Sequence, residues 1–302
     1  MRISLKNLMD SSVVLRYQLP CYITDKHVPR CHISTRNDRF LEQIGSNDNI
    51  ANLIYNGIVE YAYNDNEINT TQLDKLQIRA LQSKLKYNPN ASDKTMLGYG
   101  FQGEVLLHLI LDYYFGARKA IARGYMFSAL ENAETKGYDS YLMIENHNAI
   151  SLLFGEAKFY LSGYKDSLKS IFKNIDNALS DNYLNRNFIA MDNHYEHLDE
   201  NSRIKQIIDN WRDNPLINMA EEAKKQNIQL VYPMLVVFDD KKDTYENLIL
   251  EILAYIRTSY NAVHSTLTIP CDIFFIFFSV DNSRTIKTQV LQWIKQQQPL
   301  MP

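Results

Sequence analysis

The chain has 302 residues, 45% of them hydrophobic, which is enough apolar material for one large domain or two modest ones without disulfide or metal staples. Its three cysteines are an odd and sparse set that argues against a disulfide framework and favours a reducing compartment, so we expect a cytoplasmic protein. The formal net charge of −3 excludes a global basic field that would draw the chain onto nucleic acid, and no apolar run is long enough to cross a bilayer.

Residues 1–96 are polar and irregular apart from two helical patterns, Ile50–Tyr63 and Leu73–Leu85. We expect a smaller N-terminal subdomain there and a larger domain over residues 97–302. The segment GYGFQG, at residues 98–103, carries three glycines and marks the boundary or a flexible entrance. The chain contains no G-x-x-x-x-G-K-[ST] phosphate loop, so the sequence excludes a nucleotide-driven motor.

The next elements are a helix and a hairpin. Residues 103–116, GEVLLHLILDYYFG, are apolar on nearly every side and predict a buried helix with Glu104 in its first turn. Three strand patterns follow, YMFSAL at 125–130, YDSYLMIE at 138–145 and ISLLFGEAKFY at 150–160. The last two flank the polar turn NHNA, which predicts an antiparallel hairpin in which Glu145 pairs with Ile150.

The remainder of the chain alternates between helices and strands. Apolar residues at helical spacing predict a helix from Tyr164 to Ser180. Further helices are expected at 201–213, briefly through Ala220, at 244–260 and at 284–297, and further strands at 229–239 and 272–280. Alternating strands and helices indicate an α/β fold whose mixed sheet is covered by helices on both faces.

A pair of charged residues interrupts the third apolar strand. Side chains alternate along a strand, so Glu156 and Lys158 point to one face, and counting outward from the turn places Asp139 opposite Glu156. Two facing carboxylates repel each other, and Mg²⁺ would neutralise them because it is held by one or two carboxylates plus water and phosphate oxygens. Lys158 would then stabilise charge on a phosphate. A solvated ion pair at a strand end is the alternative.

Glu104 is a third candidate carboxylate. On its helix it shares a face with Leu107, Leu111 and Phe115, so it is directed toward the interior, where a carboxylate needs a partner. An acidic residue favoured by the helix dipole is an equal alternative. Lys165, Lys169 and Lys173 recur every four residues on the predicted helix after the site, where they would either bind DNA phosphates or form an ordinary solvated face.

A helical Glu, an Asp at the start of a hairpin and E-x-K on the returning strand, here Glu104, Asp139, Glu156 and Lys158, resemble the PD-(D/E)xK nuclease superfamily, although Tyr138 stands in place of the proline. Within the superfamily, GFQGEVLLHLILDYYFG, GYDSY and LLFGEAKFYLSGYKDSL resemble the HamA family, the nuclease subunits of Hachiman anti-phage defence, and the related AbpA proteins.

This resemblance implies a PD-(D/E)xK-type mixed sheet flanked by helices and a DNA phosphodiester hydrolase dependent on Mg²⁺, or on Mn²⁺. It implies that Glu104, Asp139, Glu156 and Lys158 are catalytic, and that Glu104, Asp139, Glu156 and Ala157 hold the metal. It also implies a partner helicase similar to HamB, for which the N-terminal subdomain is a candidate docking site. The second function class is a non-catalytic adaptor on a nuclease-like fold, which binds a helicase or DNA and whose E-x-K pair is vestigial.

Overall fold

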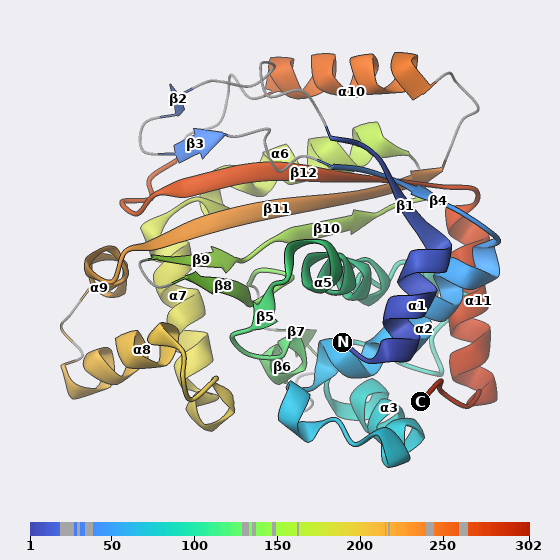
Figure 1. Ribbon diagram of the computed structural model, residues 1–302, viewed down its shortest axis with the longest axis horizontal. Coiled ribbons are helices and arrows are strands. Elements are labelled where there is room, and N and C mark those ends of the chain that lie inside the picture. Colours follow the sequence, from blue (N-terminus) through green and yellow to red (C-terminus); the bar gives the residue numbers. More distant parts are fainter. Residues whose placement is uncertain are drawn as a thin grey trace.

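A curled mixed sheet forms the centre of the protein in the computed structural model (Figure 1). The structure describes residues 1–18, 27–28, 31–33, 39–128, 133–134, 137–146, 149–161, 163–214, 216, 218–239, 245–259 and 265–302. The strands of the sheet within these residues are β1 (Val13–Gln18), β2 (His27–Val28), β3 (Cys31–Ile33), β4 (Arg39–Gln43), β5 (Arg118–Lys119), β8 (Leu142–Asn146), β9 (Ala149–Leu153), β10 (Glu156–Phe159), β11 (Ile228–Asp239) and β12 (Cys271–Val280). A separate ribbon pairs β6 (Phe127–Ser128) with β7 (Ala133–Glu134).

The sheet runs in the order β1, β4, β12, β11, β9, β8, β5, with β10 beside β11 and β3 beside β12. Strands β9 and β10 both pair with β11 in parallel, as do β11 with β12 and β12 with β4. The hairpin β8–β9 is antiparallel, as are β1 with β4 and β5 with β8. The sequence-based expectation of a mixed α/β sheet flanked by helices is therefore confirmed.

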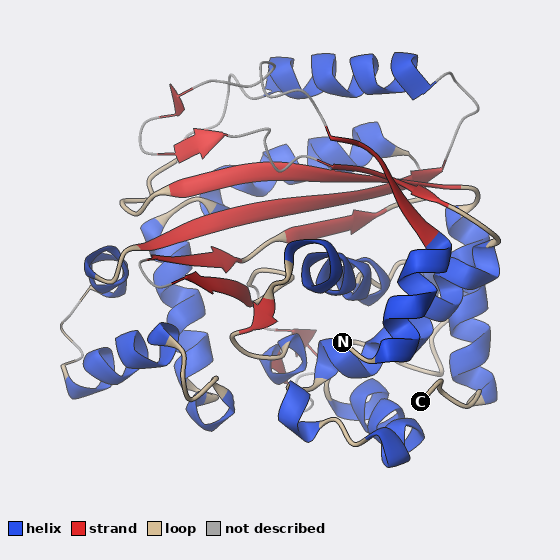
Figure 2. Ribbon diagram, in the orientation of Figure 1, coloured by secondary structure: helices blue, strands red, loops and turns tan. Residues whose placement is uncertain are grey.

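Helices cover both faces of the sheet, as Figure 2 shows. They are α1 (Ile3–Ser12), α2 (Asn47–Ala62), α3 (Leu73–Ser83), α4 (Asp93–Leu97), α5 (Phe101–Phe115), α6 (Tyr164–Ala178), α7 (Asp181–Asp192), α8 (Arg203–Asp213), α9 (Met219–Lys225), α10 (Tyr245–Ser259) and α11 (Ser283–Gln296). No helix of the described residues is long and apolar enough to cross a membrane.

Two apolar clusters divide the core between the two faces of the sheet. Alternation along β12 sends Phe275 and Phe277 to the cluster with α6, α7 and α8, and sends Ile276 and Phe278 to the cluster with α1, α2, α5 and α11. Strand β11 alternates in the same way. Because both faces of these strands are buried, they read in the sequence as continuous apolar runs.

The hairpin follows the predicted register, since Glu145 pairs with Ile150 and Leu142 with Leu153. Residues 147 and 148 of the predicted turn lie outside the described residues. The strand itself is shorter than predicted, because residues 138–141 precede β8 as an irregular segment. The predicted strand at 125–130 is wrong at its start, where Tyr125 and Met126 belong to a 3-10 helix over Arg123–Met126; residues 129–130 are not among those described.

The third predicted strand is two strands, β9 and β10, separated by Phe154 and Gly155. Opposite this break lies Pro233 of β11, which has no N–H to donate to the ladder. The backbones approach so closely that a Cβ on Gly155 would lie 2.4 Å from the Pro233 carbonyl oxygen. The break therefore depends on a glycine facing a proline, and it lies directly before Glu156.

The N-terminal residues are more regular than the sequence suggested. The expectation of an irregular segment is wrong for α1, β1 and β4, each of which contributes a buried residue to the cluster that also contains α5. Strand β4 pairs with β12, so strands from both sides of the predicted boundary at residues 96/97 join one sheet. The division into two domains at that boundary stays a prediction. The sequence analysis also missed α7, the helix that follows α6.

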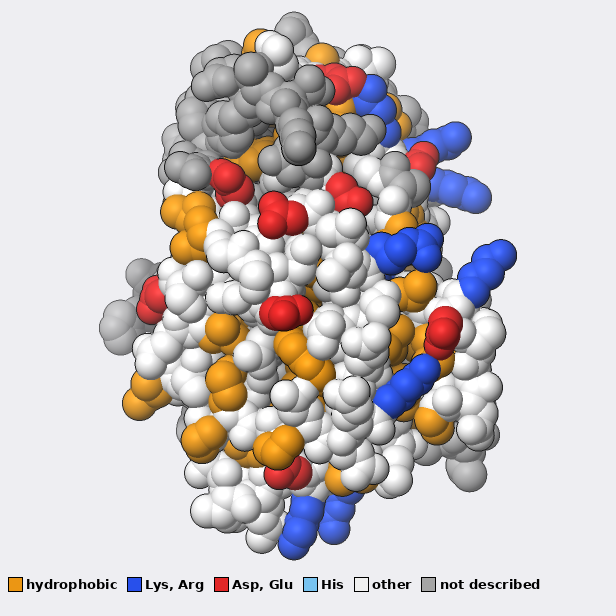
Figure 3. Space-filling model, turned by 90° about the vertical axis from the view of Figure 1, so that its right-hand side faces the viewer, with side chains coloured by type: hydrophobic (Ala, Val, Ile, Leu, Met, Phe, Trp, Pro, Cys, Tyr) orange, Lys and Arg blue, Asp and Glu red, His pale blue; other side chains and the backbone are white. Residues whose placement is uncertain are grey.

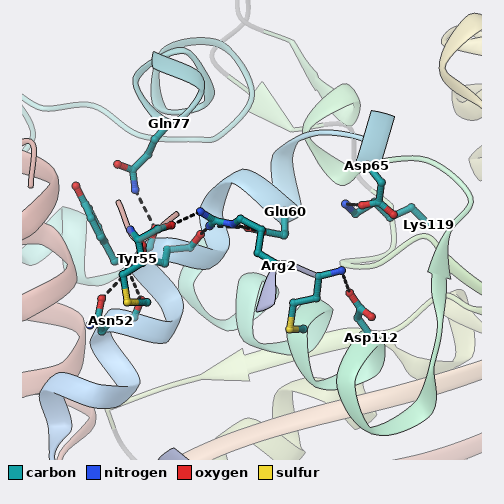
Figure 4. A network of polar contacts seen from close by, with 11 residues as sticks. Arg2, Asn52, Tyr55, Glu60, Asp65, Gln77, Asp112 and Lys119 are labelled. Atoms are coloured by element: carbon teal, nitrogen blue, oxygen red, sulfur yellow. Dashed lines mark hydrogen bonds and ion pairs between the residues drawn. The ribbon is translucent and has the colours of Figure 1, made fainter. Parts of the chain in front are cut away.

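Polar contacts tie the first residues to α2 (Figure 4). The Arg2 guanidinium donates to the carboxylate of Glu60, with an Nε to Oε1 distance of 2.5 Å, and to the backbone carbonyl of Asn56 at 2.6 Å. Glu60 is 1% exposed, so its charge depends on this partner. On the same helix, the Gln77 amide donates to the Tyr55 carbonyl at 2.8 Å, which joins α3 to α2.

Replacing Gly155 by Ala should destabilise the protein by about 1–3 kcal/mol, because the added methyl group collides with a backbone oxygen that cannot rotate away. Gly98→Ala is a matched control. At Gly98 the backbone φ is −79°, and the nearest atom to an added Cβ is 3.2 Å away. The free energy of unfolding of this control should stay within about 0.5 kcal/mol of the wild-type value. Equal values for the two variants in urea denaturation would contradict a strand break held by Gly155.

A candidate active site beside the strand break

The candidate site lies where the segment before β8 meets the start of β10. The backbone N–H of Asp139 donates to the Gly155 carbonyl at 2.8 Å. The Ser140 hydroxyl donates to the Leu153 carbonyl and accepts from the Gly155 N–H, both at 2.9 Å. Backbone and side-chain hydrogen bonds thus continue the hairpin past the end of its regular ladder and hold Asp139 against the strand break.

A buried asparagine on α7 supports this segment from behind. The Asn187 side-chain oxygen accepts hydrogen bonds from the Tyr141 hydroxyl and, at 3.4 Å, from the Tyr138 N–H, while its amide donates to the Tyr183 carbonyl at 2.7 Å. Asn187 is 2% exposed, and these bonds satisfy both ends of its amide group. The conformation of residues 138–141 is therefore fixed by a helix that is distant in sequence.

The Asp139 carboxylate reaches the edge of β10. Its Oδ2 accepts a hydrogen bond from the Ala157 N–H at 2.8 Å. Because Ala157 stands between Glu156 and Lys158 in the sequence, the Asp139 carboxylate lies beside the part of β10 that carries both charged residues. Burial and then the charge of Glu156 raise the pKa of Asp139 to about 6, although Lys158, the Ala157 N–H and Arg123 oppose the shift. Asp139 and Glu156 thus lie close enough to repel each other, as the hairpin register required.

Glu156 and Lys158 form an ion pair on one face of β10, with 2.5 Å between Lys158 Nζ and Glu156 Oε1. The Tyr232 hydroxyl donates to the other carboxylate oxygen of Glu156 at 2.7 Å. Burial would lower the pKa of Lys158, but the charges of Glu156 and Asp139 outweigh burial and raise it. The lysine is therefore cationic at neutral pH. The side chains of Lys158 and Glu156 are each 16% exposed.

Four tyrosines and one arginine surround the acidic pair. Burial raises the pKa of the phenols, to about 12 for Tyr141, so they stay protonated and uncharged at neutral pH; they are Tyr138, Tyr141, Tyr183 and Tyr232. The charge of Arg123, which is 6% exposed, lowers the pKa of Asp139. Tyr138 was noted in the sequence only as the residue in place of the proline, and none of these tyrosines was given a role, because in the printed sequence they read as ordinary core aromatics.

Glu104 lies on the helix that packs against the other face of β10. Helix α5 packs with its first turn on this strand, where a Cβ on Gly103 would lie 3.2 Å from Phe159 Cβ and 3.5 Å from Ala157 Cβ. The Glu104 carboxylate, on a residue that is 6% exposed, accepts a hydrogen bond from the Tyr61 hydroxyl of α2. Glu104 and Asp139 both act on the pKa of Tyr141, so this phenol lies within electrostatic reach of both carboxylates.

The donor set fits a hard divalent cation at the Asp139–Glu156 pair. Burial and the charge of Glu156 both disfavour the ionised form of Asp139, and a bound cation would stabilise that form. Mg²⁺ needs only one or two carboxylates besides water and phosphate oxygens. Within the described residues, no group of three or more His, Cys, Asp or Glu side chains is placed to hold a metal ion. The larger metal set of Glu104, Asp139, Glu156 and Ala157 stays a prediction.

The predicted phosphate contacts lie on α6. Lys165, Lys169 and Lys173 are exposed on the face opposite the apolar residues of this helix, and Lys165 forms an ion pair with Glu251 of α10. Figure 3 shows the right-hand side of the molecule, where Lys and Arg side chains lie toward the right-hand margin and at the lower end, separated by neutral and acidic side chains. Charge on this face is thus divided into small groups.

The family model described as HamA matches residues 19–294 of the 302-residue chain. Searches of curated proteins and of solved structures return no significant match. The matched segment includes Glu104, Asp139, Glu156 and Lys158, together with the tyrosines that surround the acidic pair.

The raised pKa of Asp139 predicts how stability depends on pH. The folded protein holds this proton more tightly than the unfolded chain, so the associated stability is present below pH 3.8 and is lost as the pH rises through about 6. Asp139→Asn can still accept the Ala157 N–H but carries no charge. In EDTA, its free energy of unfolding relative to wild type should therefore rise between pH 4 and pH 8, by roughly 3 kcal/mol at most.

Asp166→Asn, on the exposed surface of α6, is the control and should show no such change. A difference between Asp139→Asn and wild type that is the same at both pH values would mean that burial and the charge of Glu156 do not raise the pKa of Asp139 in solution.

Proposed function

The chain belongs to the HamA family, and from this premise we propose that it is the nuclease subunit of a Hachiman anti-phage defence system, a metal-dependent enzyme that hydrolyses DNA phosphodiesters under the control of a partner helicase. The observation that carries the proposal is the Asp139, Glu156 and Lys158 arrangement at the start of β10. Together with a helical Glu104, it supports assignment to the PD-(D/E)xK superfamily.

In this proposal, Asp139 and Glu156 hold Mg²⁺, or Mn²⁺, with Glu104 and the Ala157 carbonyl as further ligands. Mg²⁺ bound here would polarise the scissile phosphate and lower the pKa of a bound water. Lys158 is the cationic side chain next to this metal position, and it stabilises the negative charge that develops on the phosphate. The surrounding phenols are uncharged, so they do not add to the repulsion between the carboxylates, and the Tyr232 hydroxyl donates a hydrogen bond to Glu156.

The three lysines of α6 offer few contacts for non-specific DNA binding. Lys169 and Lys173 are exposed, whereas Lys165 would have to leave Glu251 before it could contact a phosphate. Each neutralised phosphate contributes to an affinity that falls as salt rises, and two or three such contacts give weak binding at physiological salt. We therefore assign delivery of DNA to the partner helicase.

One observation favours the adaptor as a second candidate. Both carboxylate oxygens of Glu156 already have partners in the protein, Lys158 Nζ and the Tyr232 hydroxyl, so the E-x-K pair forms a stable structural contact without a metal. In that case the chain would bind its helicase or DNA without cleaving it. Metal binding and cleavage assays separate the two candidates.

Replacing Glu156 by Gln or Lys158 by Met should lower Mg²⁺-dependent DNA cleavage by the chain and its helicase by at least about a hundredfold, because a metal ligand or a charge at the reacting phosphate is lost. The chain provides a matched control, since a second E-A-K occurs at Glu222–Lys224 on α9, where Lys224 is exposed. Lys224→Met should cleave at the wild-type rate.

A second readout does not depend on cleavage. Mg²⁺ should raise the melting temperature of the wild-type chain, because a ligand that binds only the folded state stabilises it, and this rise should disappear in Glu156→Gln. A wild-type complex that neither cleaves DNA nor responds to Mg²⁺ would favour the adaptor.

The chain should also form a stable complex with a HamB-like helicase through surfaces away from the Glu156 face, with the N-terminal residues as the first candidate. The complex should cleave plasmid at physiological salt only when ATP and the DNA trigger are present, because the isolated chain binds DNA weakly. The measurement compares cleavage by the chain alone and by the complex, with and without ATP. Rapid plasmid degradation by the isolated chain, unaltered by the helicase, would contradict this control.

A further inference from the structure

Lys287, on α11, is a buried lysine outside the proposed catalytic set. It is 3% exposed, and its ammonium donates to two backbone carbonyls, that of Phe159 at 3.1 Å and that of Tyr99 at 3.4 Å. The Nζ atom also lies 5.1 Å from the centre of the Phe159 ring, within the range of a cation–π contact. A residue near the C-terminal end of the sequence thus connects two segments that lie more than a hundred positions earlier.

The burial of this charge is unfavourable by itself. Burial lowers the pKa of Lys287 to about 8, and no carboxylate among the described residues counters the shift. A buried ammonium that has only neutral carbonyls as partners costs stability, and an apolar side chain of similar length would fill the space without that cost. The lysine therefore lowers the stability of the fold at this position, and in return it makes two directed hydrogen bonds.

The two carbonyls belong to the two segments that carry the candidate site. Tyr99 stands two residues before α5, whose first turn contains Glu104, and Phe159 directly follows Lys158 at the end of β10. The first turn of α5 also packs against β10, where a Cβ on Gly103 would lie 3.2 Å from Phe159 Cβ. Lys287 thus joins these segments at the point where they touch.

We propose that Lys287 is a positioning residue, whose ammonium fixes the first turn of α5 against the end of β10 and so sets where Glu104 lies relative to Glu156 and Lys158. This inference rests on the proposed nuclease function. The segment before α5 needs such a tether because Gly98 and Gly100 give its backbone wide conformational freedom. A displacement of about 1 Å at a catalytic constellation can lower a rate on the order of a hundredfold.

The test compares Lys287→Met, which keeps the length of the side chain and removes the donor, with Ile286→Val. Ile286 is fully buried on the same helix, so its substitution perturbs the core without removing a hydrogen bond. Amide hydrogen exchange is measured on the isolated chain for peptides covering residues 98–104 and 158–161. The kcat and KM of Mg²⁺-dependent DNA cleavage are measured on the complex with the helicase, and the melting temperature of each variant is recorded.

We expect Lys287→Met to exchange faster in both peptides and to lose on the order of tenfold to a hundredfold in kcat, with KM for DNA within about twofold of wild type. Ile286→Val should keep the wild-type exchange in these peptides and the wild-type kcat. Unchanged exchange in Lys287→Met, or faster exchange with an unchanged kcat, would overturn the proposal. So would a loss of kcat that Ile286→Val reproduces at an equal change in melting temperature, because the lysine would then be merely structural.

A wild-type complex that does not cleave DNA would contradict the proposed function instead. The exchange measurement on the isolated chain would then still decide whether Lys287 holds the two segments together.

Discussion

The hydrogen bond from the Ala157 N–H to the Asp139 carboxylate is the contact on which the candidate site depends. Strand β10 pairs with β11 along one edge, and at its other edge this amide is satisfied by an aspartate side chain. The bond supplies a partner for a backbone donor and at the same time brings the carboxylate next to Glu156. Secondary structure and the placement of a functional group are thus achieved by one interaction.

That interaction forces like charges together, and the surroundings limit the cost. Lys158 pairs with Glu156, Arg123 acts on Asp139, and tyrosines with raised pKa values present neutral hydroxyls. Burial, and then the charge of Glu156, still leave the pKa of Asp139 raised to about 6. Functional sites that bind cations commonly lower the stability of the fold, and a pair of carboxylates without a bound cation is one way in which they do so.

The two faces of β10 divide the work of the site. One face presents Glu156 and Lys158 toward Tyr232, and the other packs Ala157 and Phe159 against α5. Close packing on the second face is possible because Gly103 has no side chain, and Lys287 holds the same junction through backbone carbonyls. The α5 junction and the acidic pair thus lie on opposite faces of one strand of four residues.

The sequence by itself determined the elements whose periodicity is strong, and tertiary contacts decided the rest. The apolar runs of β11 and β12, the buried helix α5, the hairpin register and the shared face of Glu156 and Lys158 followed from local pattern, because each depends on residues a few positions apart. The same counting brought Asp139 to Glu156. Counting residues could not predict the strand break at Gly155, which arises from Pro233 on another strand. It also could not predict that Asn187, Tyr232 and Lys287 hold parts of the site in place. These residues lie between 46 and 188 positions away from their partners. Only the folded chain brings such groups together, since no sequence period links them.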